Sequence, residues 1–128
     1  MNERLVRVAE IPKRTESQNK TEWQHWSKVR KKRKMWARLA RVYVGLPDLE
    51  PKTKRRVKIT RYSSGTLDQG NFIGGCKALI DSLVDLGWIV DDSPKWVTIE
   101  YCQEKKRNGD STGIEIYEPT EAQPQERE

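Results

Sequence analysis

Residues 67–94 read LDQGNFIGGCKALIDSLVDLGWIVDDSP, which places aspartates on both sides of one apolar segment. Asp68 precedes the segment, and Asp91 and Asp92 follow Gly87, a natural helix C-cap. Between them, apolar residues recur at the spacing of a helix with one buried face, namely Ile73, Cys76, Ile80 and Leu83. The stretch therefore predicts a helix followed by a short return of the chain.

The return is long enough to bring the two acidic ends together. Two glycines disfavour helix before residue 75, and a regular helix over residues 75–86 would be about 18 Å long at about 1.5 Å per residue. A strand over residues 88–92 returns about 16 Å at about 3.3 Å per residue. Asp92 would then lie beside Asp68 and Lys77. A helix that began a turn earlier would leave this return several ångströms short.

Clustered carboxylates repel one another, so they usually hold a hard divalent metal. Each part of the pattern also has a simpler explanation. Residues 91–94 have a common turn composition, Asp81 and Asp85 suit a solvated helix face, and Lys77 and Asp81 can pair at i and i+4. The combination, in a basic chain, favours a metal that acts on phosphate.

The composition fits one domain with a modest core, because the chain has 128 residues of which 34% are hydrophobic. Five tryptophans argue against wholesale disorder. The single histidine, His25, argues against a histidine zinc site or a Ser-His triad. Cys76 and Cys102 lack Cys-x-x-Cys spacing and are predicted to be buried structural thiols. No apolar run approaches a membrane span and the N-terminus lacks a signal peptide, so a cytoplasmic protein is expected.

The net charge of +6 is concentrated in two basic blocks. Residues 20–41 hold nine Lys and Arg against one acid, Glu22, and residues 51–62 hold six Lys and Arg and no acid. The rest of the chain is acidic. One such block fits a solvated surface, but two blocks flanking a carboxylate cluster favour nucleic acid.

The remaining pattern predicts an α+β fold. Apolar alternation predicts strands, and a longer period predicts a basic helix over residues 21–43, with Arg33 interrupting its apolar stripe. The strands are expected over residues 5–11, 55–62, 88–90, 96–102 and 113–117. Asn108-Gly109 is a strong hairpin turn signal before the last strand. The order β-α-β-α-β-β-β predicts a small mixed or antiparallel sheet with two helices on one face. Residues 1–117 form the expected single domain, and 118–128 an acidic disordered tail.

The segment around the aspartates resembles the RusA family of Holliday junction resolvases, small endonucleases of bacteria and their phages. The matching residues are Asp68 and Asn71 before the helix, residues 77–83 (KALIDSL) within it, and residues 87–93 (GWIVDDS) after it. Residues 17–36 (SQNKTEWQHWSKVRKKRKMW) also look like the Ser-x-Asn and basic helix of the phage branch. The resemblance implies a RusA-like domain over nearly all of the ordered chain.

Two positions depart from the family's pattern. The family expects aspartate immediately before Asn71, where this chain has Gly70, and some members place a basic residue where Leu67 stands. Asp68 and Asp92 still provide two carboxylates. One Mg²⁺ can bind through one or two carboxylates plus waters and substrate phosphate, although fewer charges should bind it more weakly.

The resemblance implies a Mg²⁺-dependent endodeoxyribonuclease for four-way DNA junctions, acting as a homodimer in a bacterial cell and encoded by host, phage or prophage. Mn²⁺ is an alternative ion. Asp68 and Asp92 would hold the metal, Asp91 would assist, and Lys77 would lie over the scissile phosphate. The metal would activate water. The residues expected to bind DNA are Lys28, Arg30, Lys31, Lys32, Lys34, Arg56, Lys58 and Asn71.

Two alternatives remain open. The glycine at position 70 fits a non-catalytic DNA-binding relative, in which Gly70→Asp would restore activity. The basic amphipathic helix also fits an interaction module that docks on an acidic protein. Binding that ignores DNA and salt would indicate that module.

Overall fold

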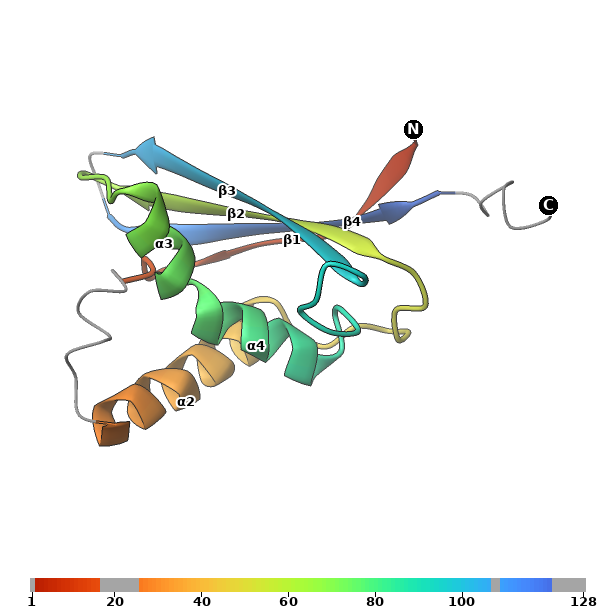
Figure 1. Cartoon of the computed structure of the whole chain (residues 1–128), viewed down its shortest axis with the longest axis horizontal. Coiled ribbons are helices and arrows are strands. Elements are labelled where there is room, and N and C mark those ends of the chain that lie inside the picture. Colours follow the sequence, from red (N-terminus) through yellow and green to blue (C-terminus); the bar gives the residue numbers. More distant parts are fainter. Residues whose placement is uncertain (1, 17–25, 107–108, 121–128) are drawn as a thin grey trace.

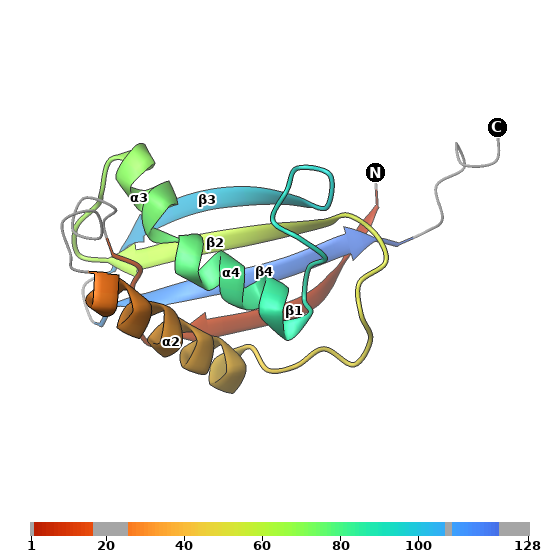
Figure 2. The same ribbon diagram turned by 60° about the horizontal axis from the view of Figure 1, so that its bottom comes forward.

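One mixed sheet, with helices against one of its faces, makes up the fold (Figure 1). The computed structural model describes residues 2–16, 26–106 and 109–120. The elements follow in the order β1 (Glu3–Ile11), α2 (Trp26–Tyr43), β2 (Arg55–Ser63), α3 (Gln69–Gly75), α4 (Lys77–Leu86), β3 (Val97–Lys105) and β4 (Ser111–Pro119). Sheet and helices form two layers (Figure 2), which confirms the predicted α+β class.

The sheet order is β1-β4-β2-β3, so β4 and β2 are the central strands. β4 pairs antiparallel with β1 and with β2, whereas β2 and β3 are parallel. The hairpin predicted from Asn108-Gly109 is therefore wrong, because β2 lies between β3 and β4. Asn108 lies outside the described residues, and Gly109 has a φ of +76°. A turn signal reports a reversal of the chain and not which strands become neighbours.

The core lies between the sheet and the helices. Val57 and Ile59 of β2 point inward, as their alternation predicted, and both are fully buried. They pair in register with Ile116 and Ile114 of β4. The same cluster includes, from the helices, Trp36, Ala40, Leu79, Ile80 and Leu83. Since burial of each Val, Leu or Ile side chain contributes about 1.5–3 kcal/mol, this cluster fixes how α2 and α4 lie on the sheet.

The basic helix buries a narrower face than its sequence indicates. Trp36 and Ala40 are buried, but Trp26 and Tyr43, predicted on the same face, are exposed. The predicted end at Tyr43 is confirmed. The predicted start at Thr21 lies outside the described residues.

Two helices replace the single helix expected after Asp68. α3 ends at Gly75 and α4 begins at Lys77, with Cys76 as the junction. A Cβ at position 75 would lie only 1.6 Å from the carbonyl oxygen of Glu16. Glycine at the break therefore allows two backbones to pack against each other.

The strand predicted over residues 88–90 is wrong. These residues form bends after Gly87, whose φ of +95° confirms it as the C-cap of α4. Trp88 and Ile89 are buried nonetheless, and Trp88 Nε1 donates to the carbonyl oxygen of Gly45 at 2.8 Å. A short apolar run fits a buried irregular segment as well as a strand, because both hide apolar side chains.

Three other predictions concern the cysteines, the tail and membranes. Cys76 is buried and Cys102 is half-buried, and neither forms a disulfide. β4 continues to Pro119, so Glu118, predicted to begin the tail, belongs to the sheet. Residues 121–128 lie outside the described chain. Within the described ranges, no helix has both the length and the apolar character needed to cross a membrane.

Candidate functional site

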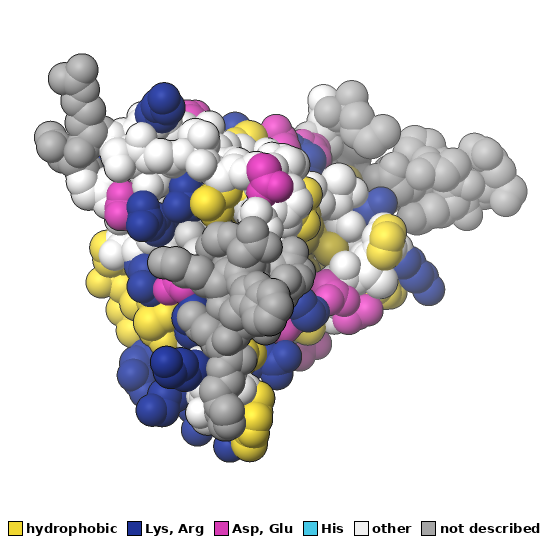
Figure 3. Space-filling view, turned by 60° about the vertical axis from the view of Figure 1, so that its left-hand side comes forward, with side chains coloured by type: hydrophobic (Ala, Val, Ile, Leu, Met, Phe, Trp, Pro, Cys, Tyr) yellow, Lys and Arg dark blue, Asp and Glu magenta, His cyan; other side chains and the backbone are white. Residues whose placement is uncertain are grey.

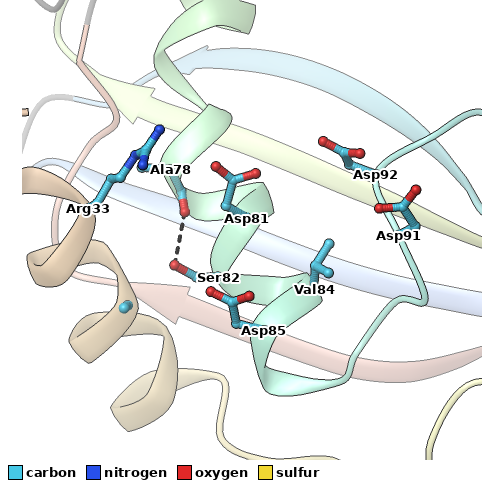
Figure 4. Close-up of a pocket in the computed structure, with 9 residues that line it drawn as sticks. Arg33, Ala78, Asp81, Ser82, Val84, Asp85, Asp91 and Asp92 are labelled. Atoms are coloured by element: carbon cyan, nitrogen blue, oxygen red, sulfur yellow. Dashed lines mark hydrogen bonds between the residues drawn. The ribbon is translucent and has the colours of Figure 1, made fainter. Parts of the chain in front are cut away.

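A pocket of about 320 Å³ lies between α2, α4 and the connection over residues 87–96. Its lining residues are Arg33, Ala37, Ala78, Asp81, Ser82, Val84, Asp85, Asp91 and Asp92 (Figure 4). Four of these are carboxylates, from two separate segments, and one is a cation. Carboxylate oxygens are the ligand type that Mg²⁺ prefers, but among the described residues no three such groups are arranged to hold an ion.

Local structure explains why these carboxylates share one place. Lys77, Asp81 and Asp85 recur every four residues along α4, which puts them on one face. The other face of the helix is buried in the core. Gly87 then reverses the chain, and the connection returns beside α4 to place Asp92 at the pocket. The predicted return is thus confirmed, although it is an irregular loop.

Lys77 lies between two of the aspartates. Its Nζ is 3.5 Å from Oδ1 of Asp81 and 3.9 Å from Oδ2 of Asp92. The side chains of Lys77, Asp81 and Asp92 are 65%, 36% and 45% exposed, so each pair contributes no more than about 1 kcal/mol. The contacts matter for position, because they hold an ammonium group where helix and connection meet.

Asp68 occupies a different place. It is the N-cap of α3, and its Oδ1 accepts a hydrogen bond from the backbone N–H of Asn71 at 3.3 Å. α3 is a separate helix of 7 residues, about 10 Å long at about 1.5 Å per residue. Asp92 therefore contacts Lys77, as expected. The expected contact between Asp68 and Asp92 is not found among the described residues. In the described ranges, no group of three or more His, Cys, Asp or Glu is arranged to hold a metal ion.

The exposed side of α2 carries the first basic block. Its exposed cations are Lys28, Arg30, Lys31, Arg33, Lys34, Arg38 and Arg41, and the helix contains no acid. Lys32 differs because it pairs with Glu16. Figure 3 shows Lys and Arg side chains gathered at the lower end of the molecule, where α2 lies. This helix therefore presents a surface rich in positive charge that reaches the pocket at Arg33.

In the second basic block, the two cations on the outer face of the sheet, Arg56 and Lys58, lie beside acids. Arg56 bonds to Glu100 at 2.7 Å and to Glu3 at 3.0 Å. Lys58 lies in register between Glu100 of β3 and Glu115 of β4. The outer face of the sheet thus alternates in charge, while the exposed side of α2 is cationic only.

Two residues that line the pocket, Asp81 and Arg33, were not predicted as site residues from the sequence. Asp81 fits a solvated helix face by its spacing, yet it contacts Lys77 across from Asp92. Arg33 interrupts the apolar stripe of α2, and that interruption is the signal that could have found it. An arginine that breaks a buried face points to a neighbouring polar site.

The sequence matches no protein-family model, and a search of curated proteins finds no match.

Proposed function

We propose that this chain is a Mg²⁺-dependent endodeoxyribonuclease of the RusA type that acts on branched DNA. The observation that carries the proposal is the position of Lys77, which lies between Asp81 and Asp92 beside a pocket that also contains Arg33. Lys77 could bind a phosphate that the cations of α2 attract, while the neighbouring aspartates could bind a metal ion beside it.

Each group has a role in this proposal. Asp92 would hold the ion from the pocket side with Asp91 assisting, whereas Asp68 stands at the head of α3 and is not among the residues that line the pocket. When bound, the ion supplies an activated water and neutralises charge on the scissile phosphate. Lys77 holds the phosphate as a compact cation, and Asn71 is a hydrogen-bonding neighbour.

The DNA contacts in this proposal follow α2. Phosphates of a duplex arm bind its exposed cations. Arg33, which also lines the pocket, binds the phosphate nearest to it. Such binding falls steeply with salt, because each neutralised phosphate releases counterions. Arg56 and Lys58 add contacts only where the DNA displaces their acidic partners. Symmetric cutting of a junction needs two active sites, so the active form is a homodimer.

The test is a four-way junction incubated with Mg²⁺ and either the wild-type protein or Asp92→Asn. We expect the wild type to cut and Asp92→Asn to lose roughly 100-fold, the effect of removing one strong electrostatic group. Asp48→Asn, outside the pocket on the connection after α2, is the matched control and should cut normally. Equal cutting by wild type and Asp92→Asn would refute the site.

A second candidate is a RusA-like protein that binds branched DNA without cutting it. Gly70, and the absence of Asp68 from the residues that line the pocket, favour this candidate. The wild type would then bind the junction with salt-dependent affinity and leave it intact with Mg²⁺ and with Mn²⁺.

A further inference from the structure

The cationic helix α2 begins with an exposed aromatic ring. Trp26 is the first residue of the helix and is 60% exposed. Among the other described tryptophans, Trp36 and Trp88 are buried and Trp96 is half-buried. Tryptophan is highly buried on average, because its large ring contributes strongly to cores and interfaces. An exposed tryptophan on a helix whose other exposed side chains are mostly cations is therefore a candidate contact for a ligand.

A guanidinium group lies against one face of this ring. Cζ of Arg30 is 4.1 Å from the centroid of the Trp26 ring, within the range of a cation–π contact. Arg30 follows Trp26 by four positions, so the two side chains are neighbours on the helix surface. The contact favours one orientation of the ring, and the residue remains 60% exposed in it. Trp26 thus offers a flat apolar surface with a positive charge behind it.

The ring stands at the end of a row of side chains that leads to the pocket. The row has helical spacing at i, i+4, i+7 and i+11, and consists of Trp26, Arg30, Arg33 and Ala37. These positions lie within an arc of about 60° at about 100° per residue. Arg33 and Ala37 line the pocket, and the start of α2 extends beyond α4 (Figure 1). The row therefore runs from an exposed ring, past two exposed arginines, to the carboxylates.

The length of the row fits a short piece of a nucleic acid strand. Trp26 and Arg33 are about 10 Å apart along the helix axis at about 1.5 Å per residue. Stacked nucleotides of one strand rise about 3.4 Å each, so about three nucleotides span that distance. A strand with one phosphate at Arg33 would bring a base to Trp26.

We infer that Trp26 stacks on an unpaired nucleobase of the strand whose phosphates α2 binds. The inference rests on the proposed function, because it takes the cations of α2 to bind DNA. Every base has a flat face, so stacking on an aromatic side chain tolerates any sequence. A base inside a continuous duplex already stacks on both of its faces. Only a base in a single strand or at a branch point can reach the ring, and Trp26 thereby favours such DNA over continuous duplex.

The experiment measures binding in EDTA, where no cutting occurs. Fluorescence anisotropy of a labelled oligothymidine gives the affinity for a single strand, and competition by relaxed closed-circular DNA, which has no ends, gives the affinity for duplex. Trp26→Leu removes the ring but keeps an apolar side chain, and Trp26→Phe keeps a smaller ring. Tyr43→Leu is the matched control, because Tyr43 is 41% exposed at the other end of α2 and lies outside the row.

We expect Trp26→Leu to weaken single-strand binding about tenfold, the effect of losing one stacked base, and Trp26→Phe to weaken it by less. Duplex binding should be unchanged in both variants, which also shows that they are folded, and Tyr43→Leu should match the wild type throughout. The salt dependence of single-strand binding should be unchanged in Trp26→Leu, because the ring neutralises no phosphate. The fluorescence of 2-aminopurine in the single strand should be quenched by the wild type and much less by Trp26→Leu.

Equal losses of single-strand and duplex affinity would overturn the inference, as would equal losses in the Leu and Phe variants, which an apolar contact with a protein would produce. Unchanged single-strand binding in Trp26→Leu would overturn it as well. Junction cutting with Mg²⁺ separates the two proposals. If Trp26 variants bind and cut like an active wild type, only the stacking role fails. If the wild type stacks a base on Trp26 but cuts no junction, the nuclease fails and the stacking role stands.

Discussion

Nζ of Lys77 lies 3.9 Å from Oδ2 of Asp92, although Lys77 begins α4 and Asp92 follows its end. The chain reverses at Gly87 and returns along the helix, so an ammonium and a carboxylate from opposite ends meet. Asp81 contacts the same ammonium from one turn further along α4. Removing either carboxylate should therefore redirect the lysine side chain without unfolding the helix.

Position 70 has room for the carboxylate that the family pattern expects. A Cβ there would meet nothing within 4 Å, and acids in the first turn of a helix are stabilising by about 0.3–1 kcal/mol. We expect Gly70→Asp to fold and to lower the Mg²⁺ concentration for half-maximal junction cutting roughly tenfold, equivalent to about 1.4 kcal/mol. Gly70→Asn is the uncharged control of similar size. The same Mg²⁺ dependence in both variants would exclude a metal role at this position. If the wild type does not cut and Gly70→Asp does, the chain is a decayed nuclease.

The cations of α2 should dominate the salt dependence of DNA binding. Lys31 and Lys34 are exposed, whereas Arg56 already bonds to Glu3 and Glu100. We expect the double variant Lys31→Gln/Lys34→Gln to reduce the slope of log K against log salt by about 2, close to one unit for each phosphate that is no longer neutralised. Arg56→Gln should change it by less. Fluorescence anisotropy with a labelled junction measures both slopes, and equal slopes for all proteins would contradict binding along α2.

Glu118 should make stability depend on pH. Burial by itself raises the pKa of Glu118, but hydrogen bonds and charges from Arg4 and Arg55 outweigh it and hold that pKa below its ordinary value. A carboxyl with a lowered folded pKa stabilises the protein above its unfolded value of about 4.3 and loses that contribution as pH falls through the folded pKa.

Glu118→Gln tests this contribution. Arg55 and Glu118 lie 2.8 Å apart with side chains 6% and 15% exposed, and breaking a buried pair costs about 3–5 kcal/mol. We expect a loss near the lower end of that range at pH 7, measured by urea unfolding, that shrinks below about pH 4. Glu100→Gln is the exposed control. A loss that stays constant from pH 7 to pH 3 would be inconsistent with this ion pair.

The two cysteines should differ in reactivity. Burial raises the pKa of the Cys76 thiol to about 12, even though the residue caps α4. The thiolate is the reactive form, so a pKa about three units above the ordinary value leaves roughly 1000-fold less of it at neutral pH. We expect iodoacetamide to label Cys102 in the folded protein and both cysteines after denaturation, as read by mass spectrometry. Cys102→Ser is the control, and rapid labelling of this folded variant would mean that Cys76 is accessible.

The positions of single elements were predictable because each carries its own period. Val57 and Ile59 alternate in β2, and Trp36 and Ala40 lie one turn apart in α2. Which strands became neighbours was not predictable from these local patterns. The Asn108-Gly109 signal marks a reversal, but the partner of β4 depends on where β2 lies.

The candidate site was predictable in part for the same reason. The return of Asp92 to Lys77 follows from helix length and the Gly87 cap. The place of Asp68 depends on the break at Gly75. The two glycines indicated a break there, but not that the backbone of Glu16 packs against it. The hydrogen bonds between Gln103 and the backbone of Leu67 were not predictable either, because they form only once β3 lies beside Leu67.

The sheet order has a consequence for synthesis on the ribosome. Of the four described strands of this sheet, β4 is the last to be made, yet it lies between β1 and β2 and supplies Ile114 and Ile116 to the core. A nascent chain that ends at residue 105 contains β1 with no neighbour to pair with and only one side of β2 paired. The sheet can therefore close only when the C-terminal strand has emerged, so the domain forms as one late event rather than from its N-terminus onward.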